Sequence, residues 1–101
     1  MKQGTTPTHT FMLPFDTSII KTVKVLYEQN GALILEKNKD DCVLEGETIS
    51  LTMTQEDTFQ FKDAKGFVYI QLRILTLEGV ALASDLMATT VDRCLDKEVL
   101  R

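Results

Sequence analysis

Hydrophobic and polar residues alternate along most of this chain, which is the pattern of β-strands that bury one face. The clearest run is Thr48 to Thr54, where Ile49, Leu51 and Met53 point one way and the threonine and serine side chains point the other. We expect a strand wherever a similar run lies between turn residues. The seven expected strands cover residues 8–13, 20–28, 32–37, 42–46, 48–54, 67–76 and 80–91.

Short polar segments between these runs have the chemistry of turns. Asn30-Gly31 tolerates positive φ at both central positions of a tight turn, which predicts a hairpin between the second and third strands. Thr54 stands three residues before Asp57, the spacing of a helix N-cap and an acidic third helical residue. It predicts a short helical turn near Thr54-Thr58. The alternative, an acid–base pair of Glu56 and Asp57, is disfavoured because adjacent side chains in a turn diverge.

Seven short strands joined by turns predict an all-β fold, an antiparallel β-sandwich of the immunoglobulin-like kind. The chain has no Trp and no inter-sheet cysteine pair of the antibody type, so only the architecture is expected. At 101 residues the chain is long enough for one core. We expect a single β-sandwich domain over residues 1–101, with a flexible N-terminal tail at 1–7 and a C-terminal tail at 92–101.

The charge and the apolar content of the chain limit the kinds of binding partner that we expect. The chain carries 11 basic and 15 acidic residues, a net charge of −4, and its basic residues are scattered. Nucleic-acid binding depends on clustered Lys and Arg, so no nucleic-acid partner is expected. No run approaches the roughly 18 apolar residues of a membrane span, and the first residues lack a signal-peptide pattern. We expect no membrane partner and no signal peptide.

Side chains that could carry chemistry are few. His9 is the only histidine, and its position beside threonines in a strand predicts a partly packed residue and not a catalytic one. Cys42 and Cys94 lack the close spacing of a zinc or redox motif, so two free thiols are favoured over a disulfide. The glycines fall singly at turns, which excludes a phosphate-binding loop. The sequence predicts no catalytic residue, no metal site and no cofactor.

Two groups of residues are candidates for an interaction surface. The first is Tyr27, Tyr69 and Arg73, because Tyr and Arg are enriched where proteins meet. The alternative, cross-strand pairing on a solvated sheet face, is the favoured explanation of these three residues. The second combines small residues of the last strand with the apolar side of the tail. Its members are Ala81, Ala83, Leu95, Val99 and Leu100.

Three stretches resemble a known group of proteins: "GTTPTHTFMLPFDTSIIKTVKVLYEQNG", "ISLTMTQEDTFQF" and "VYIQLRILTLEGVALASDLMATTV". They are similar to small β-sandwich structural proteins of Firmicutes phages and prophages, of the tail- or baseplate-associated type. In these proteins a "TPTxTF" start, an "LTQEE(T)xxF" segment and a "VxIQLRxLTxxGxxxAS" segment recur. Residues 6–7, 54–56 and 71–73 carry the likeness here, and Met53 and Asp57 depart mildly from it.

The resemblance implies a non-enzymatic virion structural or assembly protein, made in the bacterial cytoplasm and located in the virion. Its expected partners are copies of itself, as a homo-oligomer, and other virion proteins of a tail, baseplate or capsid assembly. A different class of function remains as the alternative, a binding module that contacts a carbohydrate or a protein receptor.

Overall fold

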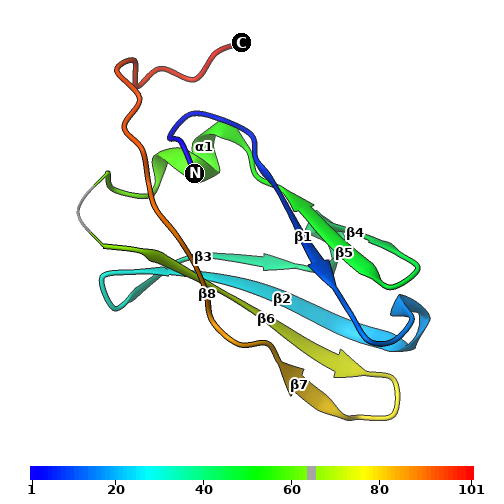
Figure 1. Cartoon of the computed structure of the whole chain (residues 1–101). Helices are drawn as coiled ribbons and strands as arrows, with labels where there is room; N and C mark the ends of the chain where they lie inside the picture. The colour runs from blue at the N-terminus through cyan, green and yellow to red at the C-terminus, as the bar shows by residue number, and fades with distance from the viewer. Residues whose placement is uncertain (64–65) are drawn as a thin grey trace.

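The computed structural model describes residues 1–63 and 66–101, and within them eight strands form two facing antiparallel sheets (Figure 1). The smaller sheet has the order β1 (Thr8–Met12), β5 (Thr48–Thr52) and β4 (Cys42–Glu45). The larger sheet has the order β3 (Ala32–Asn38), β2 (Ile20–Gln29), β6 (Val68–Thr76) and β7 (Ala81–Ala83), and β8 (Met87–Thr89) also pairs with β6. Three short helices connect the strands: η1 (Thr17–Ile19), η2 (Lys39–Asp41) and α1 (Gln55–Phe59). The predicted all-β sandwich is confirmed.

The core lies between the sheets and is built from alternate residues of the strands. Burying these side chains removes apolar surface from water, which is the main favourable contribution to folding. Each strand with strict alternation sends its apolar positions inward, as the sequence predicts. The fully buried apolar side chains are Val23, Val25, Tyr27, Ile49, Leu51, Met53, Phe61 and Val68.

The predicted local signals are also confirmed. At the hairpin between β2 and β3, Asn30 and Gly31 have φ values of 53° and 78°, so both central positions are left-handed. At α1, the Asp57 backbone N–H donates to Thr54 Oγ1 at 3.0 Å, and the Thr54 N–H donates to Asp57 Oδ2 at 2.9 Å. This reciprocal pair is a capping box, and it satisfies two backbone donors at the start of the helix.

The prediction of one strand over 80–91 is wrong, because this segment divides into β7 and β8. Both pieces pair with the same strand, β6, and the interruption lies at Ser84. There the Ser84 hydroxyl accepts a hydrogen bond from the Leu72 N–H at 2.9 Å and donates to the Asp85 carbonyl. A serine side chain that competes for backbone groups diverts the chain from a regular ladder.

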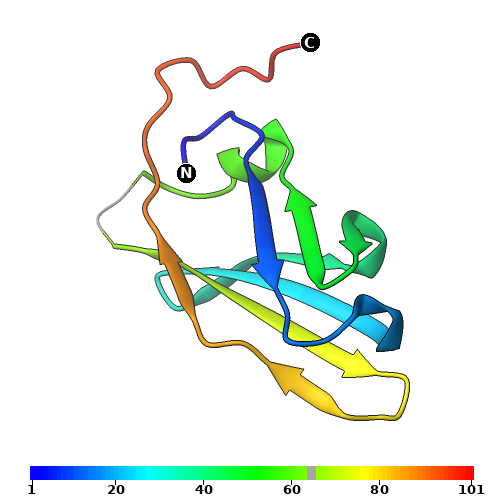
Figure 2. The same cartoon turned by 45° about the vertical axis from the view of Figure 1, so that its right-hand side comes forward.

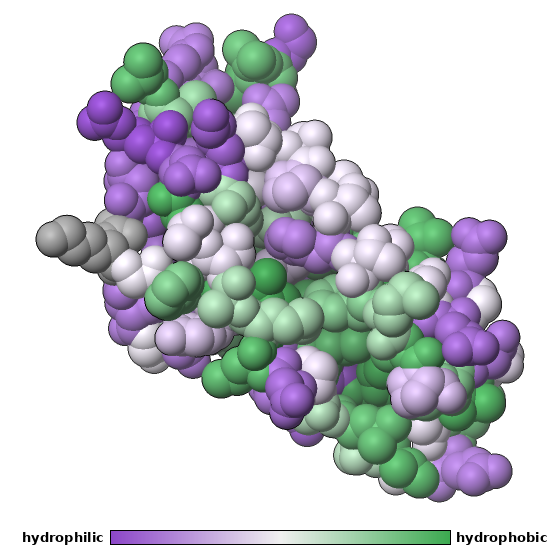
Figure 3. All heavy atoms as spheres, viewed as in Figure 1, coloured by the Kyte–Doolittle hydropathy of each residue, from purple (hydrophilic) through white to green (hydrophobic). Residues whose placement is uncertain are grey.

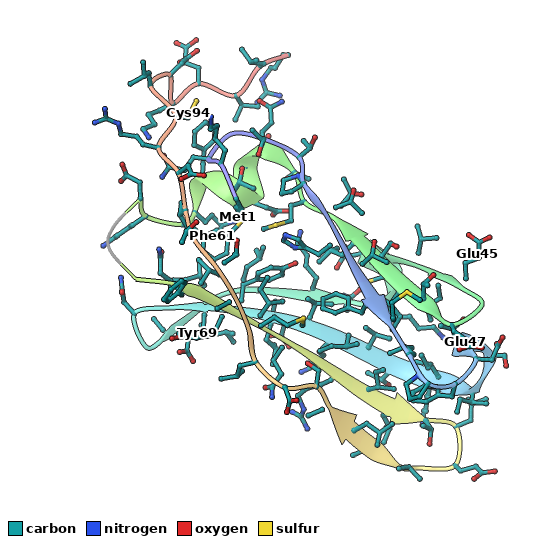
Figure 4. All side chains as sticks on the ribbon, viewed as in Figure 1. Met1, Glu45, Glu47, Phe61, Tyr69 and Cys94 are labelled. Carbon is teal, nitrogen blue, oxygen red and sulfur yellow. The ribbon has the colours of Figure 1, made fainter. Side chains whose placement is uncertain are left out.

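The N-terminal segment differs from the expected flexible tail. Gln3 is buried; its side-chain amide donates to the Phe61 carbonyl at 2.8 Å, and its backbone N–H donates to the Asp92 carbonyl at 3.0 Å. Met1, Phe61 and Cys94 gather at the end of the sandwich where α1 lies, and both termini lie there too (Figures 2 and 4). The first residues therefore close one end of the core and hold the start of the C-terminal segment.

Gly4→Ala tests this closure. Gly4 has a φ of +75°, and an added Cβ would lie 2.7 Å from Phe59 Cζ. We expect the free energy of unfolding, measured by urea titration, to fall by about 1–2 kcal/mol for the left-handed backbone and by about 1 kcal/mol more for the contact. Gly79→Ala is the matched control, since Gly79 has a φ of +86° and open space around it. Equal losses at the two positions would show that Gly4 is not packed on Phe59.

Candidate interaction surface

A polar pair of the half-buried His9 and the buried Tyr27 joins the two sheets. His9 Nδ1 of β1 lies 2.8 Å from the Tyr27 hydroxyl of β2, and the Tyr27 ring meets Phe61 edge to face at a centroid distance of 6.0 Å. Burial lowers the pKa of His9 and raises the pKa of Tyr27, so both groups are neutral near pH 7. The hydrogen bond gives the Tyr27 hydroxyl a partner inside the core and fixes the position of β1 relative to β2.

This position overturns one predicted surface residue. Tyr27 has no exposed surface, because it shares the inward parity of Val23 and Val25 on β2. Tyrosine is common at protein interfaces, but this tyrosine cannot contact a partner because Tyr27 belongs to the core.

A second polar pair lies at the start of α1. The Lys37 ammonium of β3 is 3.0 Å from Asp57 Oδ2, and both side chains are largely buried. Burial alone would raise the pKa of Asp57, but the Thr54 N–H and the Lys37 ammonium stabilise the carboxylate and hold its pKa below the usual range. The Asp57 carboxylate thus binds the Thr54 N–H and the Lys37 ammonium, while the neighbouring Glu56 is exposed to solvent.

The remaining candidates for chemistry do not form a site. Cys42 and Cys94 are both free thiols. Burial raises the pKa of Cys42, which keeps its thiol protonated, and its Sγ donates to the Asn38 carbonyl at 3.4 Å. Among residues 1–63 and 66–101, no three His, Cys, Asp or Glu side chains gather closely enough to hold a metal ion. The helices in this part of the chain are too short to cross a bilayer.

The other predicted surface residues fall into two separate places. Tyr69 and Arg73 project from the outer face of β6, where Arg73 is paired with Ala83 of β7 and the next outward position of β7 is Ala81. These four residues share one solvated sheet face. The C-terminal segment, which contains Leu95, Val99 and Leu100, lies beyond α1 and away from β7 (Figure 1). The structure does not bring the two predicted groups together.

A different surface arises from the unequal width of the sheets. The smaller sheet ends at β1, whereas the larger sheet continues past β6 to β7. Leu82 of β7 is paired with Ile74 and shares its inward side, yet it is 40% exposed because no described strand of the smaller sheet lies over it. This side of the sandwich is therefore open between the edge strands β1 and β7.

Two adjoining hollows of about 250 and 380 Å³ lie on this open side and share Phe15 and Leu82. Green, hydrophobic surface gathers there in Figure 3, in contrast to the mainly purple surface near the C-terminus. We name this surface the open-edge groove. Its principal apolar residues are Met12, Phe15, Ile19, Leu77, Val80 and Leu82.

The exposure of these side chains is high for residues of their type. Met12 is 77% exposed, Leu77 65% and Val80 51%. Single exposed apolar residues are ordinary on protein surfaces, but a contiguous apolar hollow marks a site of interaction. The alternation of strand residues does not reveal the groove, because Phe15, Ile19 and Leu77 stand in the connections between strands. Large apolar residues in turn segments were the available signal.

No family model, curated protein sequence or solved structure matches this chain.

Proposed function

We propose that this protein is a non-enzymatic structural or assembly subunit, which works by associating with copies of itself or with neighbouring proteins of a phage or prophage particle. The phage setting, the virion location and the place in a tail, baseplate or capsid assembly come from the sequence resemblance. The observation that carries the proposal of association is the open-edge groove, an apolar hollow bordered by the edge strands β1 and β7.

Three physical properties of the groove support a protein partner. Burying its apolar side chains lowers the free energy by about 25 cal/mol for each Å² that is removed from water. The edge strands beside it offer backbone donors and acceptors that another chain can pair. The lining is mainly aliphatic, with Phe15 as its aromatic ring, and this favours a protein side chain over the stacked aromatic contacts that a sugar ring prefers.

The test is the state of association of Val80→Asp. A carboxylate in the groove would have to be desolvated on association, so we expect self-association or binding to particle proteins to weaken by about tenfold or more. Light scattering at micromolar concentrations measures the first, and mass spectrometry of purified particles the second.

Val43→Asp is the matched control, because Val43 is also an exposed valine, at 64%, but lies on the outer face of the smaller sheet. It should associate like the unchanged protein. A monomer at every concentration that is also absent from particles, or equal effects of the two substitutions, would refute the proposed function.

A further inference from the structure

We infer that the open-edge groove receives the C-terminal arm (residues 92–101) of a second copy of this chain. The inference rests on the proposed function and names the partner of the same groove. The arm has no strand or helix, and two of its large apolar side chains are left in water: Leu95 is 87% exposed and Leu100 71%. An irregular segment with unburied leucines is suited to bind elsewhere.

The arm has two unlike faces when it is extended, because successive side chains of an extended chain point to opposite sides. One face alternates basic and apolar side chains without exception. The other face is mostly acidic. The first consists of Arg93, Leu95, Lys97, Val99 and Arg101, and the second of Asp92, Cys94, Asp96, Glu98 and Leu100.

The groove complements the basic and apolar face in charge. Glu78 lines it, and Asp16 and Asp85 directly follow the lining residues Phe15 and Ser84. All three carboxylates are exposed at its border. Lys and Arg side chains can lay their apolar stems along such a surface and reach a carboxylate with the charged end. Oppositely charged borders of this kind fix the register of a bound segment.

The spacing of the two hollows also agrees with the spacing of the apolar side chains on the arm. Leu72 and Thr76 face inward four residues apart on β6, and they line the first and the second hollow respectively. Leu95 and Val99 are four residues apart on one face of the arm. Each hollow can therefore take one apolar side chain of an extended arm.

The edge of β1 that pairs with no described strand supplies the backbone partner. A segment that adds to β1 extends the smaller sheet over Leu82, which is the inward side chain that the sheet leaves open. Addition of a strand at a sheet edge is a common way for a domain to bind an extended segment: backbone hydrogen bonds supply affinity and alternate side chains supply selectivity.

The arm is held to its own body at Gln3, whose side-chain oxygen accepts from the Cys94 N–H and the Lys97 ammonium, and at Gln55. It must release these contacts to bind elsewhere, and it points away from its own groove. Its hydrogen bonds to Gln55, from the Gln55 amide to the Leu100 carbonyl at 2.9 Å and from the Leu100 N–H to the amide oxygen at 2.8 Å, are solvent-exposed. It extends from the α1 end of the molecule, whereas the β6–β7 turn beside the groove lies at the opposite end (Figures 1 and 2). A second copy is therefore the natural source of the arm, in a head-to-tail contact that forms rings or filaments.

The experiment uses the full chain with Leu95→Asp and, as its matched control, Leu100→Asp. Both leucines are exposed in the arm but lie on opposite faces, so neither change should affect folding, as checked by circular dichroism. We expect Leu95→Asp to weaken self-association about tenfold or more in light scattering, and Leu100→Asp to leave it unchanged.

Mixing the Leu95→Asp and Val80→Asp proteins gives the decisive result. The first keeps an intact groove and the second an intact arm, so the mixture should form a heterodimer although neither variant associates alone. If Leu95→Asp associates like the unchanged protein while Val80→Asp does not, the groove binds something other than the arm and this inference is overturned, while the proposed function stands. If the unchanged protein does not associate at any concentration, self-association is wrong and the inference is overturned with it.

Discussion

Leu51→Asp is expected to unfold this protein, whereas Thr52→Asp is expected to leave it folded. Leu51 is 1% exposed and lies in the central strand of the smaller sheet, between β1 and β4. An unpaired carboxylate there costs several kcal/mol, a large part of the roughly 5–15 kcal/mol that stabilises a domain. Thr52 faces solvent, and its substitution removes only the exposed 2.8 Å hydrogen bond to Thr8.

Far-UV circular dichroism and urea unfolding of the two variants measure this contrast. The loss for Thr52→Asp should stay near or below about 1 kcal/mol, the usual worth of an exposed hydrogen bond. Similar losses at the two positions would place the smaller sheet in a different register, because a shift by one residue exchanges its two faces.

Asp57→Asn is expected to cost about 2–3 kcal/mol at neutral pH, because it weakens the helix cap and leaves the Lys37 ammonium without its partner in a largely buried place. The neighbouring Glu56→Gln should cost less than about 0.5 kcal/mol, as exposed substitutions usually do. Chemical unfolding of both variants across a range of pH gives the values.

The pH dependence supplies a second measure of the same pair. The pKa of Asp57 is lowered from its ordinary value of 3.8, so its stabilisation is complete above that pH and is lost as the pH falls through the lower folded-state pKa. The unchanged protein should therefore lose stability more steeply below about pH 4 than the Asp57→Asn protein. Parallel curves for the two proteins would mean that the ion pair contributes no stability.

Local features of the fold could be predicted because their signals lie within a few residues. Alternation at Ile49, Leu51 and Met53 depends only on the two faces of a strand. The hairpin at Asn30-Gly31 depends on two backbone dihedral angles, and the cap at Thr54 on a spacing of three residues. In each case one segment of the chain contains all the groups that determine the structure.

The candidate site could not be predicted because it depends on how many strands each sheet contains. The parity that makes Leu82 face inward is readable in the sequence, but its exposure follows from the absence of a described strand opposite β7. Likewise, the contact between Gln3 and Asp92 joins residues from the two ends of the chain, and no local pattern records it. The division of 80–91 at Ser84 depends on a side chain that takes the place of a backbone group in the β-ladder. Its partner, the Leu72 N–H, belongs to β6 and is distant in the sequence.

The position of Gln3 has a consequence for how the chain folds during synthesis. Its side chain bonds to the Phe61 carbonyl, 58 positions away, and to the Cys94 N–H, 91 positions away. Contacts between distant residues form late because a long loop must close first. Ribosomes add about 5–20 residues each second, so the first residues wait for seconds before their partners exist. The end of the core at α1 can therefore close only after the residues as far as Cys94 have left the ribosome.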